Sequence, residues 1–195
     1  MSENFITIVS GLPRSGTSLM MQMLQAGGMQ LLTDGQRAPD ESNPRGYLEH
    51  EAVKYGRKDL SWLEQADGKA VKVIHLLLLQ LPTDRNYRVV FMVRKLEEVI
   101  ASQRAMLKQQ GRADAKLADE KLAAVFETQI QMVRQWLAEH PTFRVLYVNH
   151  GSLMENPLAT AGHVNVLLGG NLRVGDMAAA VHPELYRQRI SAPVK

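Results

Sequence analysis

Short apolar runs alternate along this chain with longer segments in which apolar side chains recur every three or four residues. The short runs are rich in Val, Ile, Phe and Tyr, and they predict buried strands at 5–9, 70–74, 87–93 and 143–148. The longer spacing predicts helices at 18–26, 96–108 and 119–139. Shorter helices are expected within 49–66 and 151–189.

These elements follow one another in the order strand, helix, strand, helix, strand, helix. This order is typical of a parallel sheet whose connecting helices cover both of its faces. We therefore predict an α/β fold, a three-layer sandwich with a central parallel sheet. The chain has 195 residues and shows no internal repeat or linker, so we expect a single domain over 1–195.

Composition narrows the chemistry that this domain can perform. The chain contains no cysteine, which excludes disulfides, thiolate metal sites and cysteine nucleophiles. Its six histidines are scattered singly, so we expect no metal site. The net charge is only +3, and basic residues are not interleaved with aromatic ones, so we expect no nucleic acid partner.

Neither a membrane span nor a secretory signal is evident. The longest apolar stretch, around 73–81, is far shorter than the ~20 residues that a span needs. The first four residues are polar and lead directly into the first predicted strand. We therefore expect a cytoplasmic protein without a membrane partner; the sequence gives no indication of its oligomeric state.

A phosphate-binding loop is predicted at Gly11-Leu-Pro-Arg-Ser-Gly-Thr-Ser18, between the first strand and the first helix. Glycines at such a turn let backbone N–H groups converge, and the helix N-terminus adds partial positive charge. Compared with the nucleotide triphosphatase loop G-x-x-x-x-G-K-[ST], the lysine position holds Thr17. The loop instead has an earlier cation, Arg14, which can stabilise charge on a leaving phosphate.

Three motifs resemble those of sulfotransferases that use 3′-phosphoadenosine 5′-phosphosulfate (PAPS). Pro13-Arg-Ser-Gly-Thr-Ser18 is similar to the family's 5′-phosphosulfate loop. Val89-Val-Phe-Met-Val-Arg94, with Ser102 eight residues later, is similar to its 3′-phosphate site. The segment 146–157, which ends in Glu-Asn-Pro, resembles a third family element, in which His150 falls where an adenine-contacting Tyr is common.

The resemblance implies a P-loop nucleotide-binding fold and transfer of a sulfuryl group from PAPS to a hydroxyl or amine, without a metal. It implies that Arg14 stabilises the leaving phosphate. It also implies that PAPS is held by Arg14, Ser15, Gly16, Thr17, Ser18, Arg94 and Ser102. The expected acceptor is a small molecule or a carbohydrate.

The catalytic base is less clearly marked. The segment 72–82, which begins Lys-Val-Ile-His, resembles the family's Lys-Thr-His-Leu-Pro segment, so His75 is the first candidate and Lys72 a candidate second cation. Some relatives place a Glu after the first helix instead. The rival bases in that part of the chain are Asp34, Glu41, Glu49 and His50.

Two further regions bear on the acceptor and on closure of the site. The segment 32–46 is long and rich in Asp, Pro, Gly and Asn, which is typical of a functional lid or a mobile loop. With 47–62 it is expected to shape the acceptor pocket, and Tyr47, Tyr55 and Trp62 are candidate lining residues. The family's Gly-rich, Lys-containing C-terminal segment is missing, and Arg187 and Arg189 are candidate substitutes.

Two other functions remain open. One is a P-loop kinase or nucleotide hydrolase with a degenerate loop, against which Thr17 argues because the lysine that reaches the β- and γ-phosphates is missing. The other is a sulfotransferase-like protein that binds a nucleotide without catalysis.

Overall fold

A computed structural model describes residues 4–40, 43, 45–109, 111, 118–182 and 184. These residues form a four-stranded sheet, and its strands are β1 (Ile6–Gly11), β2 (Ala70–Lys72), β3 (Tyr87–Val93) and β4 (Phe143–Asn149). All neighbouring strands are parallel, in the order β2-β1-β3-β4. The prediction of an α/β fold with a central parallel sheet is confirmed.

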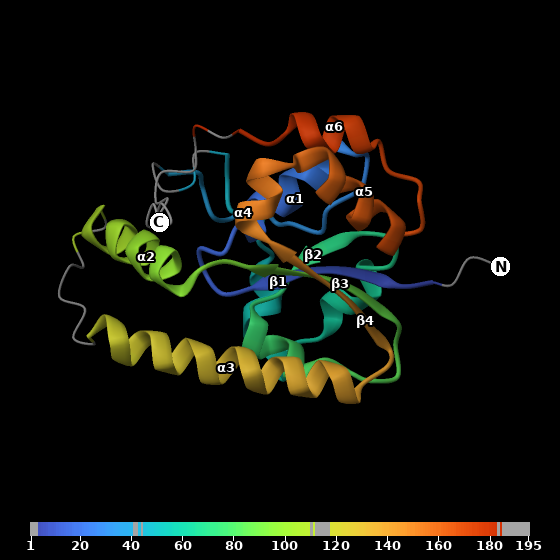
Figure 1. The fold of residues 1–195 in the computed structure, drawn as a ribbon. Coiled ribbons are helices and arrows are strands. Elements are labelled where there is room, and N and C mark those ends of the chain that lie inside the picture. The colour runs from blue at the N-terminus through green and yellow to red at the C-terminus, as the bar shows by residue number, and fades with distance from the viewer. Residues whose placement is uncertain are drawn as a thin grey trace.

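The described helices lie around this sheet (Figure 1). The α-helices are α1 (Thr17–Ala26), α2 (Leu96–Gln109), α3 (Asp119–Glu139), α4 (His150–Glu155), α5 (Pro157–Leu167) and α6 (Val174–Ala179). Three 3₁₀-helices are η1 (Glu51–Lys58), η2 (Ser61–Gln65) and η3 (His75–Gln80).

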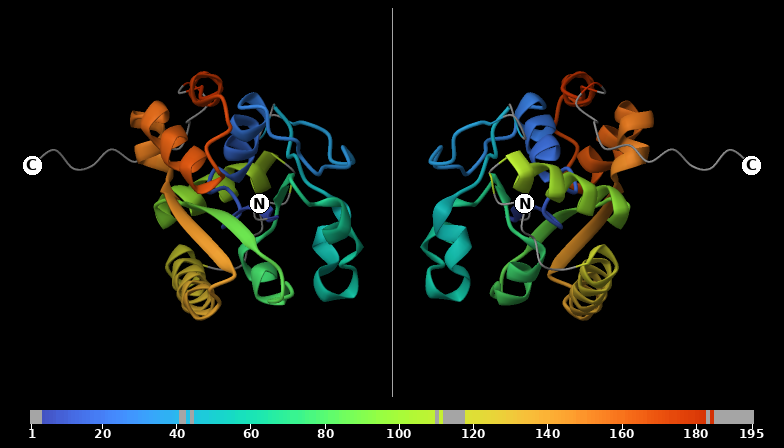
Figure 2. Two further views of the ribbon diagram at one scale, coloured as in Figure 1. Left: turned by 90° about the vertical axis from the view of Figure 1, so that its right-hand side faces the viewer. Right: turned by 90° about the vertical axis from the view of Figure 1, so that its left-hand side faces the viewer.

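Each face of the sheet is buried under its own layer of helices because alternate side chains of a strand point to opposite faces. Val89 and Phe91 of β3 pack with Trp62 and Val133 in a cluster beneath η1, η2, η3 and α3. Val90 and Met92 pack on the other face, in a cluster with residues of α1, α4, α5 and α6. Figure 2 shows the two helical layers on either side of the sheet.

A smaller cluster lies beyond the carboxyl edge of the sheet. Leu12, which follows β1, packs with Val99, Ile100 and Phe126 of α2 and α3. Leu12 is only 2% exposed, so this cluster anchors the loop between β1 and α1 against α2.

The second strand is shorter than predicted. The sequence indicates a strand over 70–74, but β2 ends at Lys72, and His75 begins η3. Leu78 is fully buried there, and Leu76, Leu77 and Leu79 pack partly against the same core cluster. A continuous apolar run fits a buried strand and a short buried helix equally well, so its pattern cannot distinguish the two.

Helix lengths also bear on membrane association. No helix within the described residues is both long and apolar enough to cross a membrane.

Candidate functional site

The loop between β1 and α1 has the backbone of a tight strand-to-helix turn. Three of its residues have positive φ: Gly11 (146°), Arg14 (71°) and Gly16 (102°). A Cβ on Gly16 would lie 2.6 Å from Cδ2 of His150, so only glycine fits there. The left-handed backbone of Arg14 is held by Arg94, whose Nη1 donates to the Arg14 carbonyl at 3.1 Å.

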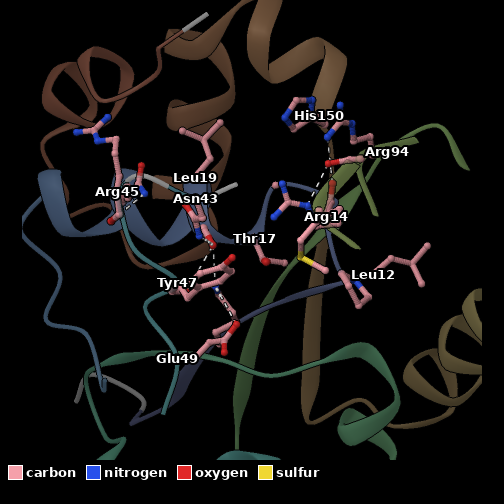
Figure 3. A pocket seen from close by; sticks show the side chains of 18 of the residues that line it. Leu12, Arg14, Thr17, Leu19, Asn43, Arg45, Tyr47, Glu49, Arg94 and His150 are labelled. Atoms are coloured by element: carbon pink, nitrogen blue, oxygen red, sulfur yellow. Dashed lines mark hydrogen bonds and ion pairs between the residues drawn. The ribbon is translucent and has the colours of Figure 1, made fainter. Parts of the chain in front are cut away.

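A cavity of about 440 Å³ opens over this loop. It is lined by loop residues, the first turn of α1, the ends of β2 and β3, parts of α2 and α4, and several described residues between Arg37 and Lys54. In Figure 3, Arg94 and His150 lie at one end of the cavity and Tyr47 and Glu49 at the other, with Arg14 and Thr17 between them. The cavity lies beyond the carboxyl ends of the strands, where ligands of open α/β sheets usually bind.

Arg14, Arg94 and Ser102 meet at one end of the cavity. Arg14 Nε donates to Ser102 Oγ at 3.0 Å, although the two residues are 88 positions apart in the chain. Arg94 Nε donates to Glu98 Oε2 at 2.9 Å, a buried ion pair that fixes the guanidinium. Burial lowers the pKa of Arg14; Tyr47 raises it and the nearby charge of Arg94 lowers it further. Two guanidinium groups and a hydroxyl held this closely are well suited to one phosphate.

His150 closes this end of the cavity. It begins α4, directly after β4, and its ring is buried against Gly16. Burial lowers the pKa of His150 to about 4, and the neighbouring charge of Arg94 also lowers it, against a smaller opposing effect of Glu98. The ring is therefore neutral at physiological pH and adds no charge to the cavity.

Lys72 and Ser18 meet farther along the cavity. Lys72 is the last residue of β2, which lies beside β1, so its side chain reaches the first turn of α1. Lys72 Nζ donates to Ser18 Oγ at 2.8 Å and to the carbonyl of Tyr47. Lys72 is only 9% exposed. Burial lowers the pKa of Lys72 to about 8, although the nearby carboxylate of Glu49 raises it.

The hydroxyl of Ser18 has both of its lone pairs engaged. It accepts from Lys72 Nζ and from Asn43 Nδ2, the latter at 2.9 Å. A serine oxygen has two lone pairs and one proton. The nearest acceptor for the hydroxyl proton is the carbonyl oxygen of Tyr47, 3.5 Å from Ser18 Oγ. This distance is longer than the roughly 2.5–3.0 Å of a good O–H···O bond. Ser18 is therefore set to donate to a ligand oxygen and not to coordinate a cation.

Glu49 lies beside this pair and faces three cations. Its Oε1 is 3.9 Å from Lys72 Nζ, and its Oε2 is 3.3 Å from Arg37 Nη1 and 3.7 Å from Lys54 Nζ. Its side chain is 22% exposed and lines the cavity. A carboxylate in this position is able to accept a proton from a ligand hydroxyl.

The phosphate-site residues named from the sequence lie close together, with one qualification. Arg14, Gly16, Thr17, Ser18, Arg94 and Ser102 line the cavity. Ser15 does not; its side chain is 1% exposed and lies under the loop, where a Cβ on Gly11 would come within 2.5 Å of Ser15 Oγ. Its backbone N–H donates to the carbonyl of Leu12 at 3.1 Å, so neither the side chain nor the N–H of Ser15 faces the cavity.

The candidate bases are spread over different places. His75 is not among the residues that line the cavity; its Nε2 is 2.9 Å from Gln129 Oε1 of α3, and burial lowers its pKa. Asp34 accepts from the backbone N–H groups of Gln36 and Glu51 instead, and His50 does not line the cavity either. Glu41 lies outside the described residues. Among the candidates that the structure describes, Glu49 is the one that lines the cavity.

The three residues expected to line the acceptor pocket also lie in different places. Tyr47 lines the cavity, whereas Trp62 is 1% exposed in the core and Tyr55 is 57% exposed on the surface. Arg187 and Arg189 lie outside the described residues. Four residues that belong to none of the sequence motifs also line the cavity, namely Arg37, Asn43, Arg45 and Lys54. Their only local signal was the unusual length and polarity of the segment that carries the first three.

Comparisons with known proteins do not assign the chain to a family. Neither a protein-family model nor a curated protein sequence matches it significantly.

The buried ammonium of Lys72 should leave a signature in the pH dependence of folding. Its pKa is about 8 in the folded chain against an ordinary 10.5, so burying the charge opposes folding fully below pH 8. This cost fades as pH rises towards 10.5. Relative to Lys72→Met, the wild type should gain about 2–3 kcal/mol in free energy of unfolding between pH 7 and pH 10. Urea denaturation at the two pH values measures this.

Lys121→Met is the matched control because Lys121 is exposed on α3. Its difference from the wild type should stay constant over the same pH interval. If the difference in free energy of unfolding between the wild type and Lys72→Met is also the same at both pH values, Lys72 is not desolvated in the folded chain.

Proposed function

We propose that this cavity binds PAPS and that the protein transfers its sulfuryl group to a hydroxyl or amine of a small-molecule or carbohydrate acceptor. In this proposal the chain has a P-loop nucleotide-binding fold. The observation that carries the proposal is the presence of two separate groups of anion-binding side chains in one cavity. Arg14, Arg94 and Ser102 form one group, and Ser18 and Lys72 form the other.

Two such groups suit a nucleotide with phosphates at two positions. Arg94 and Ser102 of the first group would hold the 3′-phosphate of PAPS, and Arg14, which lies between the two ends of the cavity (Figure 3), would reach the leaving 5′-phosphate. The second, together with the backbone N–H groups at the start of α1, would hold the 5′-phosphosulfate. A nucleoside triphosphate carries all its phosphates in one chain and does not require a second, distant group.

The environment of Ser18 favours a metal-free reaction. In P-loop kinases and hydrolases, the hydroxyl at this position coordinates Mg²⁺ through a lone pair. Here Lys72 and Asn43 donate to that oxygen, and an ammonium group beside it repels a second cation. Lys72 also supplies from β2 the positive charge that is missing from the loop at Thr17. The sulfuryl group carries less charge than a terminal phosphoryl group, so fixed cations and positioning can carry most of the catalysis.

The proposed step is an in-line displacement at sulfur. The acceptor oxygen forms a bond to sulfur, while the bond from sulfur to the bridging oxygen of the 5′-phosphate breaks. The electron pair of the broken bond stays on the leaving adenosine 3′,5′-bisphosphate. Arg14 and Lys72 stabilise that charge, and Glu49 accepts the proton of the acceptor hydroxyl. Glu49 takes this role in place of His75 because its carboxylate lines the cavity.

The 3′-phosphate role of Arg94 has a test that does not need the acceptor. Removing Arg94 alone would leave the carboxylate of Glu98 buried without its ion pair, so Arg94→Gln is combined with Glu98→Gln. We expect the affinity for adenosine 3′,5′-bisphosphate to fall about tenfold or more, the usual effect of losing a charged hydrogen bond. The affinity for adenosine 5′-monophosphate should change little. Isothermal titration calorimetry measures both.

Two variants serve as controls: Glu98→Gln alone, and Arg134→Gln on the exposed face of α3. Both should keep the preference for the bisphosphate. If the double variant loses affinity equally for both ligands, Arg94 does not contact a 3′-phosphate.

Arg14 is tested separately because its guanidinium contacts Ser102 while its backbone belongs to the loop. Arg14→Asn removes the charge with a residue that tolerates the left-handed conformation. We expect release of bisphosphate from PAPS, with water as the acceptor, to slow by about 10²-fold or more. The affinity for PAPS should fall less than this. If Arg14→Asn instead loses only the preference for bisphosphate over monophosphate, Arg14 belongs to the 3′-phosphate site and not to the transition state.

A further inference from the structure

The cavity extends from the phosphate loop along the end of β2 to residues 37–54, and this part of it is basic. Arg37, Arg45, Lys54 and Lys72 all line it. Among the described residues that line the cavity, Glu49 is the one carboxylate. The basic side chains therefore outnumber the acidic ones where an acceptor would lie beside the sulfuryl group.

Three cations surround the carboxylate of Glu49. Lys72, which also contacts Ser18 of the loop, lies near Oε1, and Lys54 lies near Oε2. Arg37 Nη1 donates to both oxygens, at 3.5 Å and 3.3 Å. Lys54 has a second carboxylate, Glu51, at 2.7 Å, but Glu51 does not line the cavity. Three cations thus contact the two carboxylates Glu49 and Glu51. A third carboxylate, Asp40, contacts the hydroxyl of Tyr47 and does not line the cavity, whereas Arg45 adds a further positive charge to its wall.

The guanidinium group of Arg37 is fixed by stacking on an aromatic ring. Its guanidinium carbon lies 3.3 Å from the centre of the Tyr47 ring. The hydroxyl of Tyr47 donates to Asp40 at 2.7 Å, which fixes the ring. A planar guanidinium fixed on an aromatic face keeps its donors oriented and suits a carboxylate.

Folding stability does not account for this cluster. The side chains of Arg37 and Lys54 are 39% and 40% exposed, and ion pairs at such exposure contribute little to stability. Basic groups gathered along the wall of a cavity do raise the local concentration of anions and orient them.

We propose that the acceptor is a hydroxy acid, and that Arg37 and Lys54 hold its carboxylate while Glu49 takes the proton of its hydroxyl. This inference rests on the proposed sulfuryl transfer, and it names the substrate class for the same site. Lys72 serves the donor side of Glu49, and Arg37 and Lys54 serve the acceptor side.

The test uses the full chain saturated with adenosine 3′,5′-bisphosphate, which occupies the donor groups. The probes are hydroxy acids, each paired with its own neutral amide: 4-hydroxyphenylacetate with 4-hydroxyphenylacetamide, and galacturonate with galacturonamide. Ligand-observed NMR measures their binding, and mass spectrometry measures sulfation when PAPS replaces the bisphosphate. We expect at least one acid to bind about tenfold more tightly than its amide, the effect of one charged hydrogen bond.

Arg37→Gln and Lys54→Gln should each reduce that preference several-fold and leave the affinity for the bisphosphate unchanged. Lys121→Gln, on the exposed face of α3, should change neither. Thermal unfolding checks that each variant folds. If Arg37→Gln does not fold, Lys54→Gln still tests the proposal.

The outcomes separate the two proposals. If the bisphosphate does not bind, the proposed function fails first. If the bisphosphate binds but the amides bind as well as the acids, or neither acid binds, the acceptor is not a hydroxy acid of this kind and the donor assignment stands.

Discussion

The cavity depends on one hydrogen bond, which the buried ammonium group of Lys72 donates to the hydroxyl of Ser18. Lys72 comes from β2 and Ser18 from the first turn of α1, and their contact spans 54 residues of chain. The same ammonium group binds the carbonyl of Tyr47 and faces Glu49. One side chain therefore joins the sheet, the phosphate loop and the segment that forms the far wall of the cavity. Desolvation of this charge is costly, as its lowered pKa indicates, and a site that binds anions offsets such a cost when the ligand arrives.

Charged side chains lie on both sides of that contact along the cavity. On one side, Arg94 uses Glu98 to hold its guanidinium and donates to the carbonyl of Arg14, while Arg14 reaches Ser102. On the other side, Glu49 contacts Lys72, Arg37 and Lys54. In the proposed function, the first of these arrangements would hold the donor nucleotide and the second would hold an acidic acceptor beside it.

The α/β fold and the tight turn between β1 and α1 could be predicted because both depend on local sequence. The short apolar runs of β1 and β3 and the three- and four-residue period of α3 are each readable within a short window. The glycines of the loop mark its turn for the same reason, since Gly16 has no room for a Cβ. The end of β2 and the helix η3 were not predictable, because Leu76–Leu79 form a continuous apolar run with no period.

Side-chain contacts between distant segments could not be predicted in this way. His75 matched a family motif in sequence, yet its ring contacts Gln129 of α3. Glu49 was one of several carboxylates after the first helix, and its approach to Lys72, 23 positions away, is a contact that a local pattern does not show. Lys72 was a candidate second cation from its motif, but its burial depends on Tyr47 and Ser18, which lie 25 and 54 positions away.

The central claim is that this cavity binds a bisphosphorylated nucleotide without a metal. Isothermal titration calorimetry tests it directly, with adenosine 3′,5′-bisphosphate titrated in the presence of EDTA and ATP titrated with Mg²⁺. We expect tight binding of the bisphosphate without metal and little binding of ATP–Mg²⁺. A preference for ATP–Mg²⁺ would contradict the account and indicate a kinase or nucleotide hydrolase, and binding of neither would remove the donor site.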